Sequence, residues 1–133
     1  MLGAACSVLT AGVAGVAVPV AKANPATPYV DHVEWAKWGD LSSLRVFPTP
    51  IARQLAAQLG TTLQADEAWA EVLALVPDAN TPGMREQFFC HWTFAEHVEP
   101  GKASWNLEPW RPQVPREAMV AAGCNPGGTE EPF

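Results

Sequence analysis

The histidines and their neighbouring carboxylates are the residues best suited to acid–base or metal chemistry. The chain has three histidines, His32, His91 and His97, and Glu96 and Glu99 lie on either side of the last of them. Zinc binds imidazole and carboxylate groups, so these five residues are the candidates for a metal site. On a helix, however, His91 and His97 are separated by about 600° of rotation and point in different directions. The spacing is not that of a zinc site, and we predict neither a metal nor a cofactor.

His91 alone has two interpretations. As a general base beside a carboxylate, it would support a small hydrolase. As a buried imidazole, it would hydrogen-bond a backbone carbonyl and stabilise the core. No Gly-x-Ser-x-Gly motif surrounds a serine, and the spacing of the acidic residues singles out no partner for the histidine. The sequence therefore assigns no catalytic residue.

Two of the six tryptophans, Trp105 and Trp110, lie in a proline-rich segment together with polar side chains. In such a segment an indole either fills the core or forms a ledge for a ligand. Glu108 and Arg111 either pair with each other or hold a ligand, because a guanidinium group binds a carboxylate through two hydrogen bonds. The candidate binding residues are therefore Trp105, Asn106, Glu108, Trp110, Arg111 and His91.

The other four tryptophans fall on predicted helices and strands. Trp69 and Trp92 lie on apolar stripes at helical spacing, which predicts that both are in the core. Trp35 and Trp38 are three residues apart in a predicted strand and therefore lie on opposite faces. We expect one of this second pair to be buried.

Cys90 and Cys124 are predicted to form a disulfide. They are the two cysteines that remain if a leader containing Cys6 is removed, and two cysteines in an exported chain allow one pairing. A loop of this length restricts the unfolded chain by roughly 3.5–4 kcal/mol. The alternative is that Cys90, next to His91, is a reactive thiol or a metal ligand.

The first 23 residues have the composition of a secretory signal peptide. Residues 1–20 carry no charge and are rich in Ala, Val, Gly and Leu, and residues 21–23 form a small-x-small cleavage pattern. No Lys or Arg precedes the apolar stretch, which departs from the usual leader. The alternative is a membrane-spanning helix, for which the stretch is short and interrupted by Gly12, Gly15 and Pro19.

Removal of the leader would leave three regions. We expect a proline-rich junction at residues 24–28, a globular domain at residues 29–126 and a flexible tail at residues 127–133. The length of the middle region suits one domain with a modest core.

The charge of the chain excludes several classes of partner. Eight basic residues stand against 14 acidic residues, for a net charge of −6 at pH 7. Binding to nucleic acid needs clustered Lys and Arg, and here the basic residues are sparse and scattered. An acidic protein also adsorbs poorly to anionic lipid, and we expect no stable membrane insertion after processing. A protein or a glycan of the cell envelope remains as the expected partner.

A β-hairpin is expected at the start of the globular domain. Residues 29–38 are rich in strand-forming Tyr, Val and Trp, and residues 44–47 form a second short candidate strand. Turn residues lie between them at 39–40 and 42–43. Pro48 ends the second strand, because proline cannot donate a hydrogen bond to a ladder.

Two helices are expected next. Residues 51–59 place apolar side chains four residues apart, and Gly60 follows as a helix terminator. Asp66 has the character of an N-cap for a second helix, whose apolar stripe occupies residues 69–76.

The segment after Thr81-Pro82 has two possible structures. A helix beginning at this pair would place Met84, Phe88, His91, Trp92 and Ala95 on one face. A strand over residues 87–94 would also give one apolar face, and periodicity does not separate the two. The capping hydroxyl and the proline at the first turn favour the helix.

The C-terminal part of the domain is expected to be irregular and then helical. Three prolines in residues 105–115 predict an extended segment that follows the surface. Residues 115–122 predict a short helix ending at Gly123. The predicted disulfide would then tie this helix to the segment around Cys90.

Three segments carry a similarity to a known family: GMREQFFCHW at 83–92, SWNLEPWRP at 104–112 and CNP at 124–126. Over roughly residues 29–126 the chain resembles the secreted bacterial family catalogued as domain of unknown function 2599. The resemblance implies a secreted domain in which both cysteines belong to the family pattern. It implies no activity, catalytic residue or substrate.

The sequence as a whole predicts a small single α+β domain. We expect an N-terminal β-hairpin packed with three or four short helices and closed by one disulfide. The leading functional hypothesis is a secreted or envelope-associated protein that binds a protein or a glycan through a tryptophan-bearing surface. The alternative is a small secreted hydrolase that uses His91 and a carboxylate.

Overall fold

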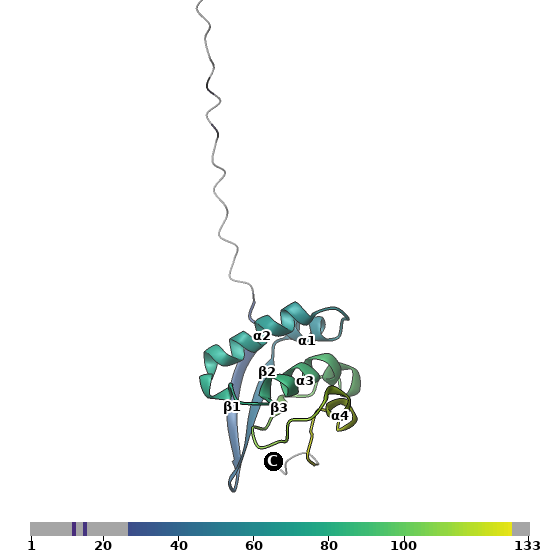
Figure 1. Cartoon of the computed structure of the whole chain (residues 1–133). Helices are drawn as coiled ribbons and strands as arrows, with labels where there is room; N and C mark the ends of the chain where they lie inside the picture. Colours follow the sequence, from purple (N-terminus) through teal and green to yellow (C-terminus); the bar gives the residue numbers. More distant parts are fainter. Residues whose placement is uncertain (1–11, 13–14, 16–26, 129–133) are drawn as a thin grey trace, which may run out of the picture.

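The computed structural model describes residues 12, 15 and 27–128 (Figure 1). Within this part, a three-stranded antiparallel sheet packs with four α-helices and one 3₁₀ turn. The expected α+β class, with its N-terminal hairpin, short helices and one disulfide, is confirmed. The predicted leader, apart from residues 12 and 15, and the predicted tail beyond residue 128 lie outside the described residues.

Strands β1 (Val30–Trp38) and β2 (Leu41–Pro48) form the predicted hairpin. Gly39 adopts a φ of 57° in the connecting turn, a conformation that a residue without a Cβ tolerates easily. The second predicted turn, at residues 42–43, is wrong. Both serines belong to β2, where Ser43 pairs with Ala36 and is completely buried.

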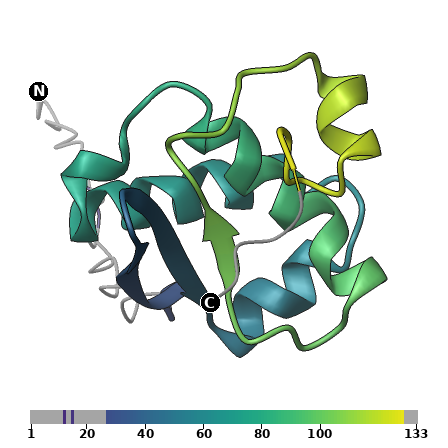
Figure 2. The same cartoon turned by 90° about the horizontal axis from the view of Figure 1, so that it is seen from below.

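A third strand, β3 (Trp105–Leu107), lies in the segment that was expected to follow the surface. It pairs antiparallel with β2, so that Leu107 is opposite Leu44 and Trp105 is opposite Val46. The expectation of a surface segment is wrong for these residues, because alternate side chains of β3 enter the core before the first proline of the segment. Figure 2 shows β3 alongside the two longer strands.

The sheet buries one face against the helices (Figure 1). Leu44, Val46, Trp105 and Leu107 occupy this face, and each is at most 1% exposed. Helix α3 packs on β3 and helix α2 packs on β1. Burial of apolar area on this face is the main term that stabilises the domain.

The first helix, α1 (Pro50–Ala56), is shorter than predicted. Its N-cap is Thr49, whose hydroxyl accepts a hydrogen bond from the Ala52 N–H at 3.3 Å. The helix ends before Leu59, which is 94% exposed because it reaches no core surface. Gly60 follows with a φ of 77° and reverses the chain.

Helix α2 (Thr62–Leu75) starts earlier than the Asp66 cap predicted. Ala65 in the first turn is buried, so this turn already packs against the core. Asp66 pairs instead with Arg85 at 2.6 Å. Trp69 and Val72 lie in the core as expected, and the short 3₁₀ turn η1 (Pro77–Ala79) ends the unit.

Helix α3 (Met84–Val98) confirms the helical interpretation of the ambiguous segment. It begins at Met84, two residues after the Thr81-Pro82 pair, and its N-cap is Gly83, whose φ of 88° disfavours most other residues at this position. The predicted inward face is correct, since Met84, Phe88, His91 and Trp92 are each at most 5% exposed. Among the described residues, no helix has the length and apolar character needed to cross a bilayer.

Aromatic rings surround Phe88 at the centre of the core. Its ring centroid lies 5.5 Å from that of Trp69, 6.3 Å from that of Trp92 and 6.0 Å from that of Trp105. These spacings are those of favourable tilted and edge-to-face aromatic pairs. Three of the six tryptophans therefore have structural positions.

Helix α4 (Arg116–Ala121) is tied to α3 by the predicted disulfide. Cys90 and Cys124 are bonded, with their Cα atoms 5.5 Å apart. Together with Met119 they form a small apolar cluster beside the main core. The reactive-thiol and metal-ligand interpretations of Cys90 are therefore wrong for this fold.

Candidate functional site

The six residues proposed for binding separate into an enclosed group and an accessible one. Four of them are at most 5% exposed, whereas Asn106 is half-buried and Trp110 is 36% exposed. An enclosed side chain contacts a ligand only if the surrounding structure opens. The enclosed residues are Trp105, Glu108, Arg111 and His91.

Glu108 and Arg111 form a buried ion pair. An Arg111 N–H group donates to the Glu108 carboxylate at 3.2 Å, and both side chains are inaccessible to solvent. Arg111 also donates to the backbone carbonyls of Pro126 and Gly128, at 3.1 and 3.3 Å. Of the two roles considered from the sequence, the structure has the mutual pairing. This network holds the C-terminal segment against the chain that follows β3.

Gln87 is the central residue of this network, and the sequence interpretation did not include it. Its side chain donates to the Glu108 carbonyl at 2.8 Å and accepts from the Glu108 N–H at 2.9 Å. The amide thus completes both backbone hydrogen bonds of a buried residue. The sequence did offer a signal for this residue, because Gln87 lies one helical turn before His91. In the structure Gln87 is 1% exposed on the inward face of α3.

His91 is a buried imidazole that hydrogen-bonds a backbone carbonyl, which is the structural interpretation of this residue. Its Nδ1 donates to the Gln87 carbonyl at 2.9 Å, because a carbonyl oxygen can only accept. This bond orients the ring. The ring also borders a pocket of about 240 Å³ between α3 and the C-terminal segment, which Glu99, Lys102 and Asn125 help to line.

Two further cavities lie on the other side of α4. One of about 300 Å³ is lined by Phe89, Phe94 and Met119 with Arg85 and Arg116 at its rim. The other, of about 210 Å³, adjoins it beside the loop between α1 and α2. Both have linings of mixed polar and apolar residues, and we assign no catalytic arrangement to either.

Trp110 is fixed in one orientation although it is accessible. Its indole N–H donates to the backbone carbonyl of Ser42 at 2.9 Å. The guanidinium of Arg111 lies over one face of the ring, 4.5 Å from the ring centre. The side chain nevertheless remains 36% exposed, so a ligand can reach part of the ring.

The end of the hairpin carries further exposed apolar side chains. Trp35 is 42% exposed, Trp38 is 55% exposed and Leu41 is 38% exposed. The expectation that one of the two tryptophans is buried is wrong. Trp35 lies on the edge strand β1, and Trp38 lies next to the turn, where the hairpin extends past the helices (Figure 1). We call these three residues together with Trp110 the hairpin-end surface.

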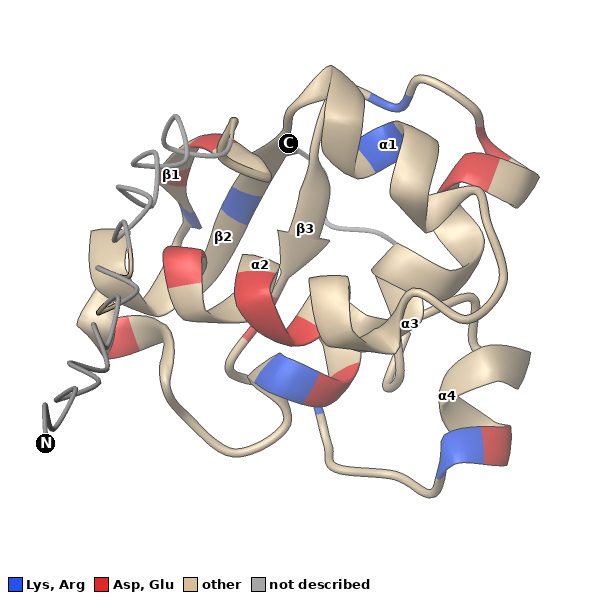
Figure 3. Cartoon of the chain, turned by 90° about the horizontal axis from the view of Figure 1, so that it is seen from above, with Lys and Arg blue, Asp and Glu red and all other residues tan. Residues whose placement is uncertain are grey.

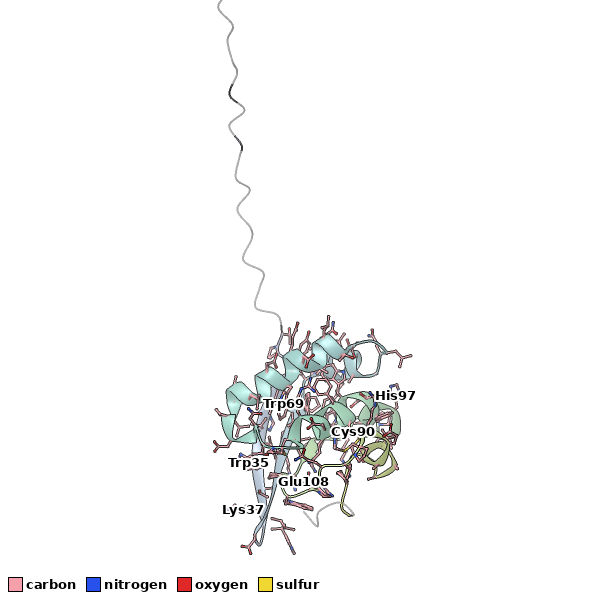
Figure 4. The ribbon with its side chains drawn as sticks, in the orientation of Figure 1. Trp35, Lys37, Trp69, Cys90, His97 and Glu108 are labelled. Atoms are coloured by element: carbon pink, nitrogen blue, oxygen red, sulfur yellow. A yellow bond between two sulfur atoms is a disulfide. The ribbon has the colours of Figure 1, made fainter. Side chains whose placement is uncertain are left out.

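The hairpin-end surface is separate from the disulfide and from the histidines of α3. Figure 4 shows Trp35 and Lys37 on the hairpin, apart from Cys90 and His97 on the far helix. Trp35 pairs with Leu44 and faces the helices, whereas Trp38 pairs with Leu41 on the outer face of the sheet. Trp110 lies at the edge of β2 beside Ser42, the second residue after the turn.

The charges of the domain are dispersed. Figure 3 shows the few basic residues on separate elements, and acidic residues on β1, α2 and α3. Several basic residues are paired, including Arg53 with Glu96 at 2.6 Å. Within residues 27–128, no group of three His, Cys, Asp or Glu side chains is arranged to hold a metal ion.

Comparison with known proteins gives a family but no activity. A family model described as "Protein of unknown function (DUF2599)" matches residues 30–127. The chain is 59% identical over 95 residues to the uncharacterized protein Rv0477 of Mycobacterium tuberculosis, covering 71% of this chain and 64% of that relative. It is 48% identical over 90 residues to the uncharacterized protein ML2452 of Mycobacterium leprae, covering 68% and 72%.

Neither these relatives nor the solved structures add a function. The chain spans 64% of the length of the Mycobacterium tuberculosis relative, and of the uncharacterized protein Mb0487 of Mycobacterium bovis, to which it is also 59% identical. No solved structure matches.

Proposed function

The chain belongs to DUF2599, a family of unknown function, and on that premise we propose that it is an exported protein that binds a protein or a glycan of the cell envelope through its hairpin-end surface. The observation that carries the proposal is the exposure of three indoles on or beside the hairpin, in a domain whose other three indoles are in the core. Exposed tryptophans are costly to hydrate and are enriched where proteins meet ligands.

The proposal moves the binding role from the residues favoured by the sequence to residues that a ligand can reach. Of the original six, Trp110 remains, with half-buried Asn106 close to it in the chain. Arg111 packs against the Trp110 ring and is itself held by Glu108, so in this proposal neither residue contacts the ligand. The enclosed network thus contributes to binding by fixing the geometry of an accessible ring.

The disulfide supports the export part of the proposal. Structural disulfides persist in oxidising compartments and are rare in the bacterial cytosol. The Cys90–Cys124 bond joins residues 34 apart and holds a helix of six residues on a small apolar cluster. A domain of this size would lose much of its stability if the bond were reduced.

Sedimentation with isolated envelope material tests the proposal. The disulfide-bonded chain without residues 1–23 is mixed with envelope particles and the bound fraction is measured. We expect binding that falls at least about tenfold in Trp38→Ser and in Trp110→Leu, because each removes an exposed indole.

A matched control variant separates recognition from a general loss of exposed apolar surface. Leu59→Ser removes a large apolar side chain that is 94% exposed and lies far from the hairpin. It should bind as the parent does. Equal loss of binding in Leu59→Ser, or unchanged binding in both tryptophan variants, would show that the hairpin-end surface is not the binding surface.

A hydrolase is the second candidate, because His91 is oriented by Gln87 and borders a pocket that also contains Glu99. In this arrangement Nε2 of His91 would be the general base. The test is incubation of the domain with envelope material, followed by mass spectrometry of the released products. Products that require the protein and disappear with both His91→Gln and Glu99→Gln would favour this function over simple binding.

A further inference from the structure

We infer that the ligand of the hairpin-end surface is an uncharged glycan, and that Trp110 is the ring on which one of its sugars stacks. The inference rests on the proposed function and names its ligand class. Five properties of the surface support it: the fixed orientation of one ring, the small exposed area, the arrangement of the rings, the overall charge, and the polar groups at its border.

The orientation of Trp110 is determined before a ligand arrives. The hydrogen bond to Ser42 fixes one edge of the indole and Arg111 covers one face. Arg111 itself is 3% exposed and is held by Glu108 and by the Pro126 carbonyl. A flat apolar face held in this way loses little conformational entropy on binding. The C–H face of a sugar ring is a matching flat apolar surface.

The area of the surface suits a sugar chain better than a protein. The three exposed indoles show 42%, 55% and 36% of their surface. With up to about 250 Å² for a whole tryptophan, they present roughly 300 Å² together. A stable protein interface needs about 800 Å² from each partner.

The arrangement of the rings points to the same conclusion. Trp35 and Trp38 lie on opposite faces of the hairpin, and Trp110 lies at its edge. A broad protein surface would contact one of these faces and leave the other in water. A narrow chain of sugar rings needs a single ring at each contact.

The charge of the molecule indicates an uncharged ligand. The net charge is −6, and the guanidinium nearest to Trp110 is already engaged in the buried ion pair with Glu108. An anionic polysaccharide would be repelled by the domain as a whole, and no clustered cations offset this among the described residues. Binding to a neutral glycan should accordingly vary little with salt.

Polar groups at the border of the surface are suited to sugar hydroxyls. Lys37 is exposed and pairs with Ser42 across the hairpin, and Asp40 is exposed in the turn. Isolated polar groups around an aromatic ring provide orientation without a large contact area.

Titration with soluble oligosaccharides tests the inference directly. The probes are chitotetraose, cellotetraose and mannotetraose, each added at millimolar concentration to the disulfide-bonded domain without residues 1–23. Binding is followed by the indole N–H resonances in nitrogen-15 NMR spectra. We expect at least one probe to bind and to shift the Trp110 resonance.

Two variants at position 110 distinguish stacking from bulk hydrophobicity. Trp110→Tyr keeps a flat ring and should retain most of the affinity for the probe. Trp110→Leu keeps apolar volume without a flat face and should weaken binding about tenfold or more. Unchanged dispersion of the remaining indole resonances shows that both variants are folded.

Each other outcome overturns a defined part of the account. Undiminished sugar binding by Trp110→Leu overturns the assignment of the ring. If no probe binds but envelope material binds until it is treated with protease, the glycan is wrong and the proposed function survives with a protein partner. If neither probes nor envelope material bind, both proposals fail.

Discussion

Glu71 fixes the beginning of the sheet at the level of single atoms. Its carboxylate accepts the backbone N–H groups of Tyr29 and Val30, each at 2.8 Å. We expect Glu71→Ala to lower the free energy of unfolding by about 2 kcal/mol, because two backbone donors lose a charged acceptor. Urea denaturation measures the change.

A glutamate without such a role provides the control for this prediction. Glu117→Ala alters an exposed residue of α4 and should change the free energy of unfolding by no more than about 0.5 kcal/mol. A loss in Glu71→Ala that is no larger than the loss in Glu117→Ala would contradict the role given to Glu71.

Tyr29 should make the stability of the domain fall as the pH rises in the alkaline range. Burial raises the pKa of Tyr29 above its ordinary value of 10.0, and the carboxylates of Glu67 and Glu71 raise it further. The folded state therefore favours the neutral phenol. Its contribution to stability is complete below pH 10.0 and is lost as the pH rises through the raised pKa.

The titration can be assigned without ambiguity because the chain has one tyrosine. We expect the ultraviolet absorbance of the phenolate to give a pKa above 10.0 in the folded protein, and a lower value in Glu71→Ala. Tyr29→Phe should remove this part of the alkaline loss of stability in urea denaturation. A folded-state pKa at or below 10.0 would contradict the prediction.

Individual tryptophans show which environments a sequence pattern can predict. Trp69 and Trp92 were predicted to be buried because helical periodicity defines an inward face, and both are. Alternation within a strand likewise places Trp35 and Trp38 on opposite faces. It does not say how far the helices extend sideways over an edge strand, and here Trp35 on β1 stays 42% exposed although Leu44, opposite it on β2, is buried.

Gln87 links two elements through buried hydrogen bonds, and its loss should be costly. Gln87→Ala removes the acceptor of the buried Glu108 N–H and one of two donors to the Glu108 carbonyl, which the Arg111 N–H also reaches, so we expect a decrease of about 2 kcal/mol in the free energy of unfolding. Gln87→Glu keeps the acceptor but turns a carboxylate oxygen toward the Glu108 carbonyl at a buried position, so it should also be destabilising. Chemical denaturation of both variants provides the measurement.

Gln58→Ala is the comparison for this pair, since Gln58 is exposed in the loop between α1 and α2. If Gln58→Ala destabilises the domain as much as Gln87→Ala does, the hydrogen bonds of Gln87 do not hold the chain after β3 against α3.

The disulfide should matter most for α4. On the loop-entropy model, reduction of the bond or the double change Cys90→Ser with Cys124→Ser should cost roughly 3.5–4 kcal/mol. Since α4 packs on a small cluster apart from the main core, its backbone amides should exchange hydrogen faster while those of β1 and β2 remain protected. Equal protection of α4 before and after reduction would contradict this account.

The extent of each element was harder to predict than its type. The helical nature of α3 and α4 followed from cap residues and spacing, and the hairpin followed from two strand-like runs around Gly39. The three residues of β3 could not be identified in this way, because a strand so short is defined by its pairing with β2. Helix α1 ended early for a similar reason, since packing rather than periodicity decides how far a helix continues.

At the scale of the whole molecule, the polar side chains that the sequence suggested for binding form hydrogen bonds in the interior, whereas three indoles are exposed at the surface. Glu108, Arg111 and Gln87 connect α3, the chain after β3 and the C-terminal segment. The hairpin-end surface lies at the border of this network, which supports Trp110. The sequence could not show which of its six candidate binding residues a ligand can reach, because accessibility depends on the assembled fold: Trp110 is exposed, whereas Trp105, Glu108 and Arg111 are enclosed.

The indole N–H resonances of the six tryptophans test this division most directly. Each is assigned from a Trp→Phe variant, and isolated envelope material is then added to the disulfide-bonded domain. The account predicts that the signals of Trp35, Trp38 and Trp110 shift or broaden, with Trp110 among those most affected, while Trp69, Trp92 and Trp105 respond less. A response that is uniform over all six, or largest at the three buried indoles, would contradict it.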